Sequence, residues 1–124
     1  MTNQTYTIFL DNKKIGTTNF EYVDAPMGVV FGKINFIESH FGYDFIKNYC
    51  DENNIKYTDY QEDKIIATMH IPNLRTTNIK EVEIIGLGCS IEGMDNEGFR
   101  IAILGIDFLL YQHEFPQYTK ITLC

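Results

Sequence analysis

Hydrophobic and polar residues alternate along most of this chain, which is the pattern of β-strands with one buried face. Tyr6, Ile8 and Leu10 share one parity and a polar turn follows at 11–14, so we expect the chain to open with a β-hairpin. Strands are predicted at 6–10, 15–23, 29–37, 64–71, 82–91, 99–106 and 118–123, with a short extended piece at 55–60.

Glycines interrupt this alternation at two places. Gly32, inside the predicted strand 29–37, indicates a bulge or the close approach of another backbone. The alternation changes phase at residues 85–86, which predicts a β-bulge there. Residues 74–80 are expected to form a loop, and residues 107–115 fit either a continued strand or a short helix.

One segment has a helical period instead. Apolar residues recur at helical spacing from about residue 39 to residue 53, which leaves Asp44 and Lys47 on the opposite face. Ser39 is a candidate N-cap, and a left-handed residue at 53–54 would end the helix. The face expected to pack on a sheet consists of Phe41, Phe45, Ile46, Tyr49 and Cys50.

These elements imply an α+β fold. The expected architecture is a mostly antiparallel, curved β-sheet of about seven strands with one main helix packed on one face. The strands follow one another too closely for parallel βαβ crossovers, which need a dozen or more residues each. The 124 residues are expected to form a single domain, 1–124, large enough to bury a core without cross-links.

Charge and cysteine content narrow the classes of function. A net charge of −7 repels phosphate backbones, so nucleic-acid binding is not expected. Three scattered cysteines (Cys50, Cys89 and Cys124) make a poor disulfide framework and are expected to stay reduced. Because the sequence shows neither a signal peptide nor an apolar run of membrane-spanning length, we expect a cytoplasmic protein without a membrane partner.

No motif with the spacing of a catalytic, metal or cofactor site appears. Residues 86–91 (GLGCSI) begin like a dinucleotide-binding loop but place Ile91 where the third glycine belongs. The three histidines are far apart in sequence, without HxH, HExxH or CxxC spacing. We therefore predict no enzyme activity, catalytic residue, metal or cofactor.

The most unusual segment is acidic and contains tyrosines, between residues 51 and 63. Tyrosine is enriched at the centres of protein interfaces, and carboxylates speed the encounter with a basic partner. The alternative is an ordinary solvated helix end and hairpin. The candidate partner-binding residues are Asp51, Glu52, Tyr57, Asp59, Tyr60, Glu62 and Asp63.

Small size, acidic charge, a β-rich pattern and the lack of catalytic motifs together resemble the immunity proteins that bacteria use to neutralise toxins. The resemblance implies a protein-binding module that blocks a basic, nuclease-like toxin domain with an acidic, tyrosine-containing surface. One alternative is a small-ligand-binding or enzymatic domain with a pocket near the segment from Met27 to Gly32. Another is a homo-oligomer that pairs through an edge strand.

Overall fold

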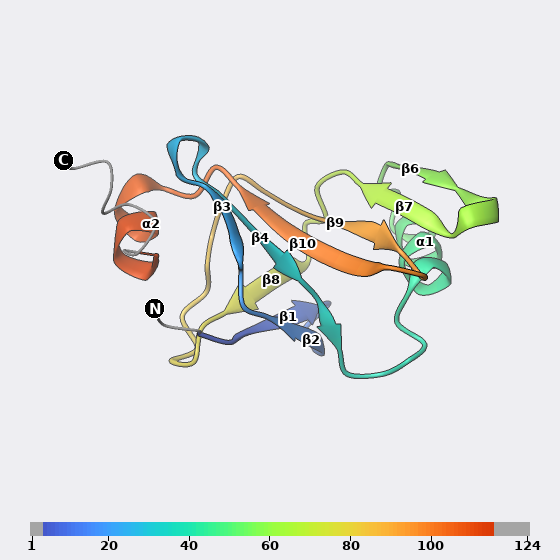
Figure 1. Cartoon of the computed structure of the whole chain (residues 1–124), viewed down its shortest axis with the longest axis horizontal. Helices are drawn as coiled ribbons and strands as arrows, with labels where there is room; N and C mark the ends of the chain where they lie inside the picture. Colours follow the sequence, from blue (N-terminus) through green and yellow to red (C-terminus); the bar gives the residue numbers. More distant parts are fainter. Residues whose placement is uncertain (1–3, 116–124) are drawn as a thin grey trace.

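The computed structural model describes residues 4–115, and the predicted strand at 118–123 lies outside these residues. The fold is α+β, as predicted, but its strands form two antiparallel sheets instead of one (Figure 1). The smaller sheet has the order β5 (Asn35–Phe36), β2 (Lys13–Thr18), β1 (Tyr6–Leu10), β8 (Leu74–Thr77). The larger has the order β3 (Tyr22–Asp24), β4 (Val29–Lys33), β10 (Gly98–Leu104), β9 (Gly88–Met94), β7 (Ile65–Thr68), β6 (Tyr57–Tyr60).

Two predicted strands are each divided between the sheets. Residues 15–23 contribute to β2 in the small sheet and β3 in the large one, with the chain bending at Phe20, where φ is 47°. Residues 29–37 divide in the same way into β4 and β5, on either side of Ile34. Phe20 and Ile34 are both buried, so each bend directs an apolar side chain into the space between the sheets.

Gly32 has the role predicted for it. A Cβ atom at this buried position would lie 2.3 Å from Thr18 Oγ1 and 2.7 Å from the backbone nitrogen of Phe20. The strand β4 therefore passes the end of β2 at a distance that only glycine allows.

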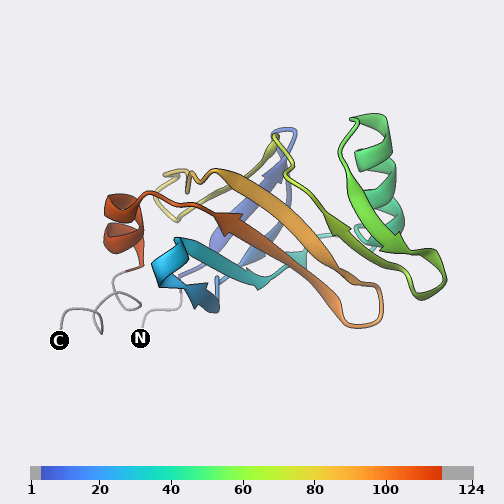
Figure 2. The ribbon, with the colours of Figure 1, turned by 90° about the horizontal axis from the view of Figure 1, so that it is seen from above.

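The core lies on one face of the six-stranded sheet. Val30, Ile66, Ile91 and Ile101 alternate inward along β4, β7, β9 and β10 and are fully or almost fully buried. The four-stranded sheet and α1 (Tyr43–Glu52) lie on this inner side, whereas no secondary-structure element of residues 4–115 covers the outer side (Figure 2).

The helix α1 begins at Tyr43, later than predicted, and the predicted inward face is confirmed in part: Ile46 and Cys50 are buried, whereas Phe41, Phe45 and Tyr49 are only partly buried against the core. Its N-cap is Gly42 instead of Ser39, and its buried residues are Tyr43, Ile46 and Cys50. Asp95 supplies the missing cap, because its Oδ1 accepts a hydrogen bond of 2.9 Å from the Tyr43 amide. A carboxylate held there also interacts favourably with the helix dipole.

Two further segments differ from their predictions, one resolves an open choice, and two predicted turns are short 3-10 turns. Residues 74–80 are not wholly a loop, because β8 occupies Leu74–Thr77. Residues 82–87 precede the strand instead of forming a bulge within it, because β9 starts at Gly88. The turn after β6 is a short 3-10 turn, η2 (Gln61–Asp63), and residues 107–115 contain a helix, α2 (Phe108–Glu114). Another short 3-10 turn, η1 (Ala25–Met27), joins β3 to β4.

Candidate functional site

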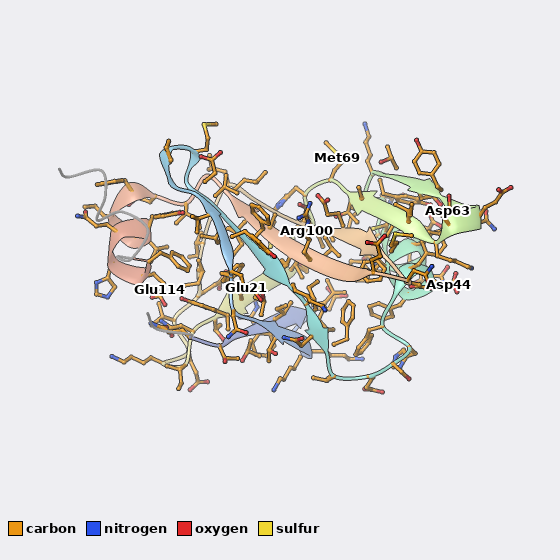
Figure 3. All side chains as sticks on the ribbon, viewed as in Figure 1. Glu21, Asp44, Asp63, Met69, Arg100 and Glu114 are labelled. Carbon is orange, nitrogen blue, oxygen red and sulfur yellow. The ribbon has the colours of Figure 1, made fainter. Side chains whose placement is uncertain are left out.

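The seven predicted partner-binding residues lie at one end of the molecule, on α1, β6 and η2, but their side chains do not form one surface. Figure 3 shows Asp44 and Asp63 at this end and Glu114 at the other. The seven side chains lie in three different local environments.

Asp59 is held within the fold. Its carboxylate accepts a short hydrogen bond from the Tyr43 hydroxyl and lies 3.3 Å from Lys47 Nζ, and its side chain is only 23% exposed. The Tyr43 hydrogen bond and the neighbouring Lys47 lower the pKa of Asp59. The pKa of Tyr43 is raised, first by the hydrogen bond to Asp59 and then by burial. Asp59 therefore joins β6 to α1 and is less accessible than the sequence suggests.

Asp51 and Tyr57 are paired with each other. The Tyr57 hydroxyl donates a hydrogen bond of 2.8 Å to Asp51 Oδ1, and this contact raises the pKa of the Tyr57 phenol. The pair joins the last turn of α1 to the start of β6, and Glu52 lies exposed beside it at the end of the helix.

Tyr60, at the end of β6, and Glu62 and Asp63 of η2 are exposed, and Tyr60 is 69% accessible. The turn between β9 and β10 lies directly beside them, because the Asp95 amide donates a hydrogen bond of 3.3 Å to the carbonyl of Lys64. This turn adds two exposed carboxylates that the sequence analysis did not include. We call the resulting surface the acidic tip: Tyr60, Glu62, Asp63, Asp95 and Glu97.

The uncovered face of the six-stranded sheet adjoins the acidic tip. Its side chains alternate with the buried ones and none of those described is itself buried. A hollow of about 390 Å³ lies in it, floored by Ile65, Ala67 and Met94. Arg100 and Glu92 form an exposed ion pair of 3.1 Å in its lining. We call this hollow the trough.

The trough is bordered by aromatic side chains. Tyr22 and Phe31 stack with ring centroids 5.2 Å apart, and the Arg100 guanidinium lies over the Phe31 ring at 5.2 Å. A partly apolar hollow with aromatic side chains at its border, beside a group of carboxylates, has features common in protein interfaces.

A hollow also lies near Met27, where the sequence left a ligand pocket open. Its volume is about 160 Å³, below the range of about 300–1,000 Å³ that is usual for small-molecule sites. It is lined by Pro26, Met27, Gly28, Ile106, Phe108 and Tyr111.

The cysteines of the described chain do not have the environment of nucleophiles. Burial raises the pKa of Cys50 to about 11 and that of Cys89 to about 12. Both thiols are therefore protonated at neutral pH, and a thiol reacts through its thiolate. His70 lies near Cys89, but its Nδ1 accepts a hydrogen bond from the Cys89 amide.

Three further features were sought among the described residues: a metal site, a dinucleotide-binding loop and a membrane-spanning helix. Within 4–115, no three His, Cys, Asp or Glu side chains are grouped as metal ligands. Residues 86–91 run into β9 and precede no helix directly, so they lack the helix N-terminus that a dinucleotide loop requires. No helix in this part of the chain is both long and apolar enough to cross a membrane.

Asp59→Asn is expected to lower the melting temperature near pH 7, by an amount that shrinks in acid. Because folding depresses the pKa of Asp59 below 3.8, its ionised form stabilises the fold above that pH, and the contribution is lost as pH falls through the depressed value. Thermal unfolding of both proteins between about pH 7 and pH 2 measures the difference. Asp63→Asn, an exposed control, should leave the melting temperature unchanged. If Asp59→Asn lowered the melting temperature by the same amount at every pH, the depressed pKa of Asp59 would be contradicted.

Comparisons with known proteins identify no relative of this chain. No protein-family model matches the sequence, and no curated protein or solved structure shows significant similarity to the chain.

Proposed function

We propose that this chain is a protein-binding module whose acidic tip and trough together bind a basic protein. The observation that carries the proposal is the meeting of two acidic turns, 61–63 and 94–98, beside an exposed tyrosine and an uncovered sheet face. Each turn by itself would be an ordinary solvated loop, so the proposal depends on the two turns lying side by side.

The charge of the tip suits a basic surface. Its four carboxylates are exposed, and Lys64, which follows Asp63, lies 3.5 Å from the carboxylate of Asp44 outside the tip. Opposite charges on two proteins steer their encounter and raise the association rate, while exposed pairs add little to the affinity. The tip therefore accounts for the speed and selectivity of binding.

The trough accounts for the strength of binding. Ile65 and Met94 are half-buried, and Tyr60 pairs with Ile65 across β6 and β7. A partner side chain that fills the trough would remove this apolar surface from water and place Tyr60 at the centre of the contact.

In its more specific form, the proposal is that the partner is the basic domain of a bacterial toxin and that the chain is its immunity protein. A basic cleft that binds phosphate can be blocked by carboxylates that occupy the same positions. The small, acidic, β-rich character of the chain supports this form.

The test uses the basic toxin domain expected beside the gene for this chain, with association and dissociation rates measured at about 0.1 M and 1 M salt. The screening length falls from about 10 Å to about 3 Å over this range. Glu62→Lys combined with Asp63→Lys should slow association at low salt and flatten its salt dependence. Tyr60→Ala should chiefly speed dissociation, at a cost of about 2 kcal/mol.

The matched control is Glu81→Lys combined with Glu83→Lys, which makes the same change in net charge. These exposed residues precede β9, in a loop whose Asn78 is hydrogen-bonded to Glu114 of α2, at the other end of the molecule (Figure 1). If both double substitutions slowed association equally, only the net charge of the chain would matter. That result would contradict the acidic tip as the binding site. A toxin domain that does not bind would contradict the immunity function.

A further inference from the structure

The strand β6 forms one edge of the six-stranded sheet, and β7 is its single neighbour among the described strands (Figure 1). Three other strands lie at sheet edges. The outer side of β8 is occupied by the segment that follows it, because the Ile84 amide donates a hydrogen bond of 2.9 Å to the Thr76 carbonyl. The other two, β3 and β5, are shorter than β6. Within the described part of the chain, β6 is therefore the longest edge strand without such a cover.

The hydrogen bonds of β6 determine which of its backbone groups point to the open edge. The Met69 amide donates a hydrogen bond of 2.8 Å to the Lys56 carbonyl, so Lys56 faces the neighbouring strand. In an antiparallel pair, such residues alternate with residues whose N–H and C=O groups point away from the neighbour. The register along β6 is regular, so the backbone groups of Tyr57 and Asp59 point to the open edge. No described group forms a hydrogen bond with them.

The helix α1 supports β6 without covering this edge. It packs more closely against β7 than against β6. Its contacts with β6 are made by side chains on the inner side of the sheet, where Tyr43 and Lys47 hold Asp59. Asp51 accepts a hydrogen bond of 2.8 Å from the Tyr57 hydroxyl. The strand is thus held from its inner side, while its outer backbone groups stay free.

The edge lacks the features by which exposed strands avoid pairing. Such strands carry proline, lysine or a bulge, or a charged side chain that points inward without a partner. Residues 57–60 contain neither proline nor lysine, and their pairing with β7 has no register shift. The one inward charge, Asp59, already has Lys47 as its partner. A further strand is therefore able to pair with β6.

The charges at the two ends of β6 favour a basic segment there. Asp51 and Glu52 lie near its start, in the last turn of α1, where no basic residue offsets them or the negative end of the helix dipole. The turn η2, which follows its end, adds two more carboxylates, and Lys56 is the one cation between residues 51 and 63. A second copy of this chain would bring like charges to this edge, whereas cationic side chains would meet opposite ones.

We propose that the basic partner adds an extended segment to β6 as a seventh strand of the large sheet, with lysine or arginine side chains near both ends of the segment. Because each residue has one N–H and one C=O, Tyr57 and Asp59 offer two donors and two acceptors to this strand. Main-chain hydrogen bonds of this kind give affinity in strand addition. The inference rests on the proposed function for the identity of the partner and adds the way in which the partner is held.

Amide hydrogen exchange of the full chain tests the proposal, with a synthetic peptide as the probe. The peptide alternates valine and threonine between terminal lysines and has about six residues, enough to run the length of β6 at about 3.3 Å per residue. At about ten times its Kd it should slow exchange of the Tyr57 and Asp59 amides about tenfold, because only the unbound fraction exchanges. The Thr58 amide, which faces β7, should exchange at the same rate with and without peptide. Unchanged exchange at Tyr57 and Asp59 at every peptide concentration would show that β6 does not accept a strand.

Two control peptides separate strand pairing from charge. Methylation of the internal amide nitrogens removes the hydrogen-bond donors of the peptide and leaves its charge unchanged. Replacement of both lysines by glutamate keeps the donors and reverses the charge. Neither control should slow exchange at Tyr57 or Asp59. If the methylated peptide slowed it as much as the probe, charge alone would account for binding and the proposal would be wrong.

Tyr57→Pro, with Tyr57→Ala as its control, makes the matching change in the chain. Tyr57 is the first residue of β6, a position at which a strand tolerates proline. Both substitutions remove the phenol, but only proline removes the outward N–H. The peptide should bind Tyr57→Ala and not Tyr57→Pro, and equal binding would contradict the proposal. If thermal unfolding showed that Tyr57→Pro does not fold, the exchange experiment on the unchanged chain would decide.

The toxin-binding test gives a separate result. A toxin domain that binds while the peptide leaves Tyr57 and Asp59 unprotected would support the proposed function and overturn the added strand. A peptide that protects both amides, together with a toxin domain that does not bind, would support strand addition and contradict the immunity function.

Discussion

Ile46→Ala is expected to lower the free energy of unfolding by about 2–5 kcal/mol, the range for truncating a buried isoleucine. Ile46 is 3% exposed in the centre of the inward face of α1, between Tyr43 and Cys50. Phe45→Ala should cost less although it removes more atoms. Phe45 is only half-buried at the edge of the core, where its ring also lies 4.7 Å from that of Phe41 and 6.1 Å from that of His40 between centroids, both before the helix.

Chemical denaturation of the two variants and of Asp44→Ala measures this order. Asp44 is exposed and makes only a surface ion pair of 3.5 Å with Lys64, so its loss should cost at most about 1 kcal/mol. If Phe45→Ala proved more costly than Ile46→Ala, Phe45 would lie at the centre of the packed face of the helix, in contradiction to the structure.

Gly32→Ala is the second substitution with a large expected effect. The added methyl group would lie 2.3 Å from Thr18 Oγ1, 2.6 Å from Glu21 Oε1 and 2.7 Å from the Phe20 nitrogen. Since all three atoms belong to the bend that passes from one sheet to the other, relief requires the sheets to move apart. Overpacking of a core costs about 1–3 kcal/mol and occasionally more, and we expect the upper part of that range.

Gly88→Ala provides the comparison within the same sheet. Its added methyl group would meet only Leu104 Cδ1 at 3.8 Å and His70 Nδ1 at 3.9 Å, which are ordinary contacts. Its effect should therefore be small, or a stabilisation of about 0.4–1 kcal/mol from the reduced freedom of the unfolded chain. Denaturant midpoints of the two variants decide the matter, and equal midpoints would contradict the close passage of β4 past β2.

Local periodicity was enough to predict the α+β class, the helix and the antiparallel strands, because each depends on neighbours within a few residues. It could not reveal the second sheet. Phe20 and Ile34 continue the apolar pattern of their strands, yet each is the residue at which the chain turns from one sheet into the other. The turn depends on packing between segments far apart in sequence, such as Gly32 against Thr18.

In the candidate site, too, local sequence predicts some residues correctly, whereas the environment of others depends on contacts with distant segments. Glu62, Asp63 and Tyr60 could be predicted as exposed because they occupy a short polar turn. Asp59 belongs to the same acidic segment, but its carboxylate contacts Tyr43 and Lys47, two side chains of the helix. Asp95 and Glu97 join the site only because β7 pairs with β9, with Ile65 opposite Met94.

The hydrogen bond from the Tyr43 amide to Asp95 fixes the acidic tip to the helix as well as capping it. A surface loop that must become ordered on binding loses conformational entropy, and that loss is subtracted from the affinity. The turn that carries Asp95 and Glu97 is held at the start of α1 on one side and at Lys64 on the other before any partner arrives. Its carboxylates are thus preorganised for the binding of a basic partner that we propose.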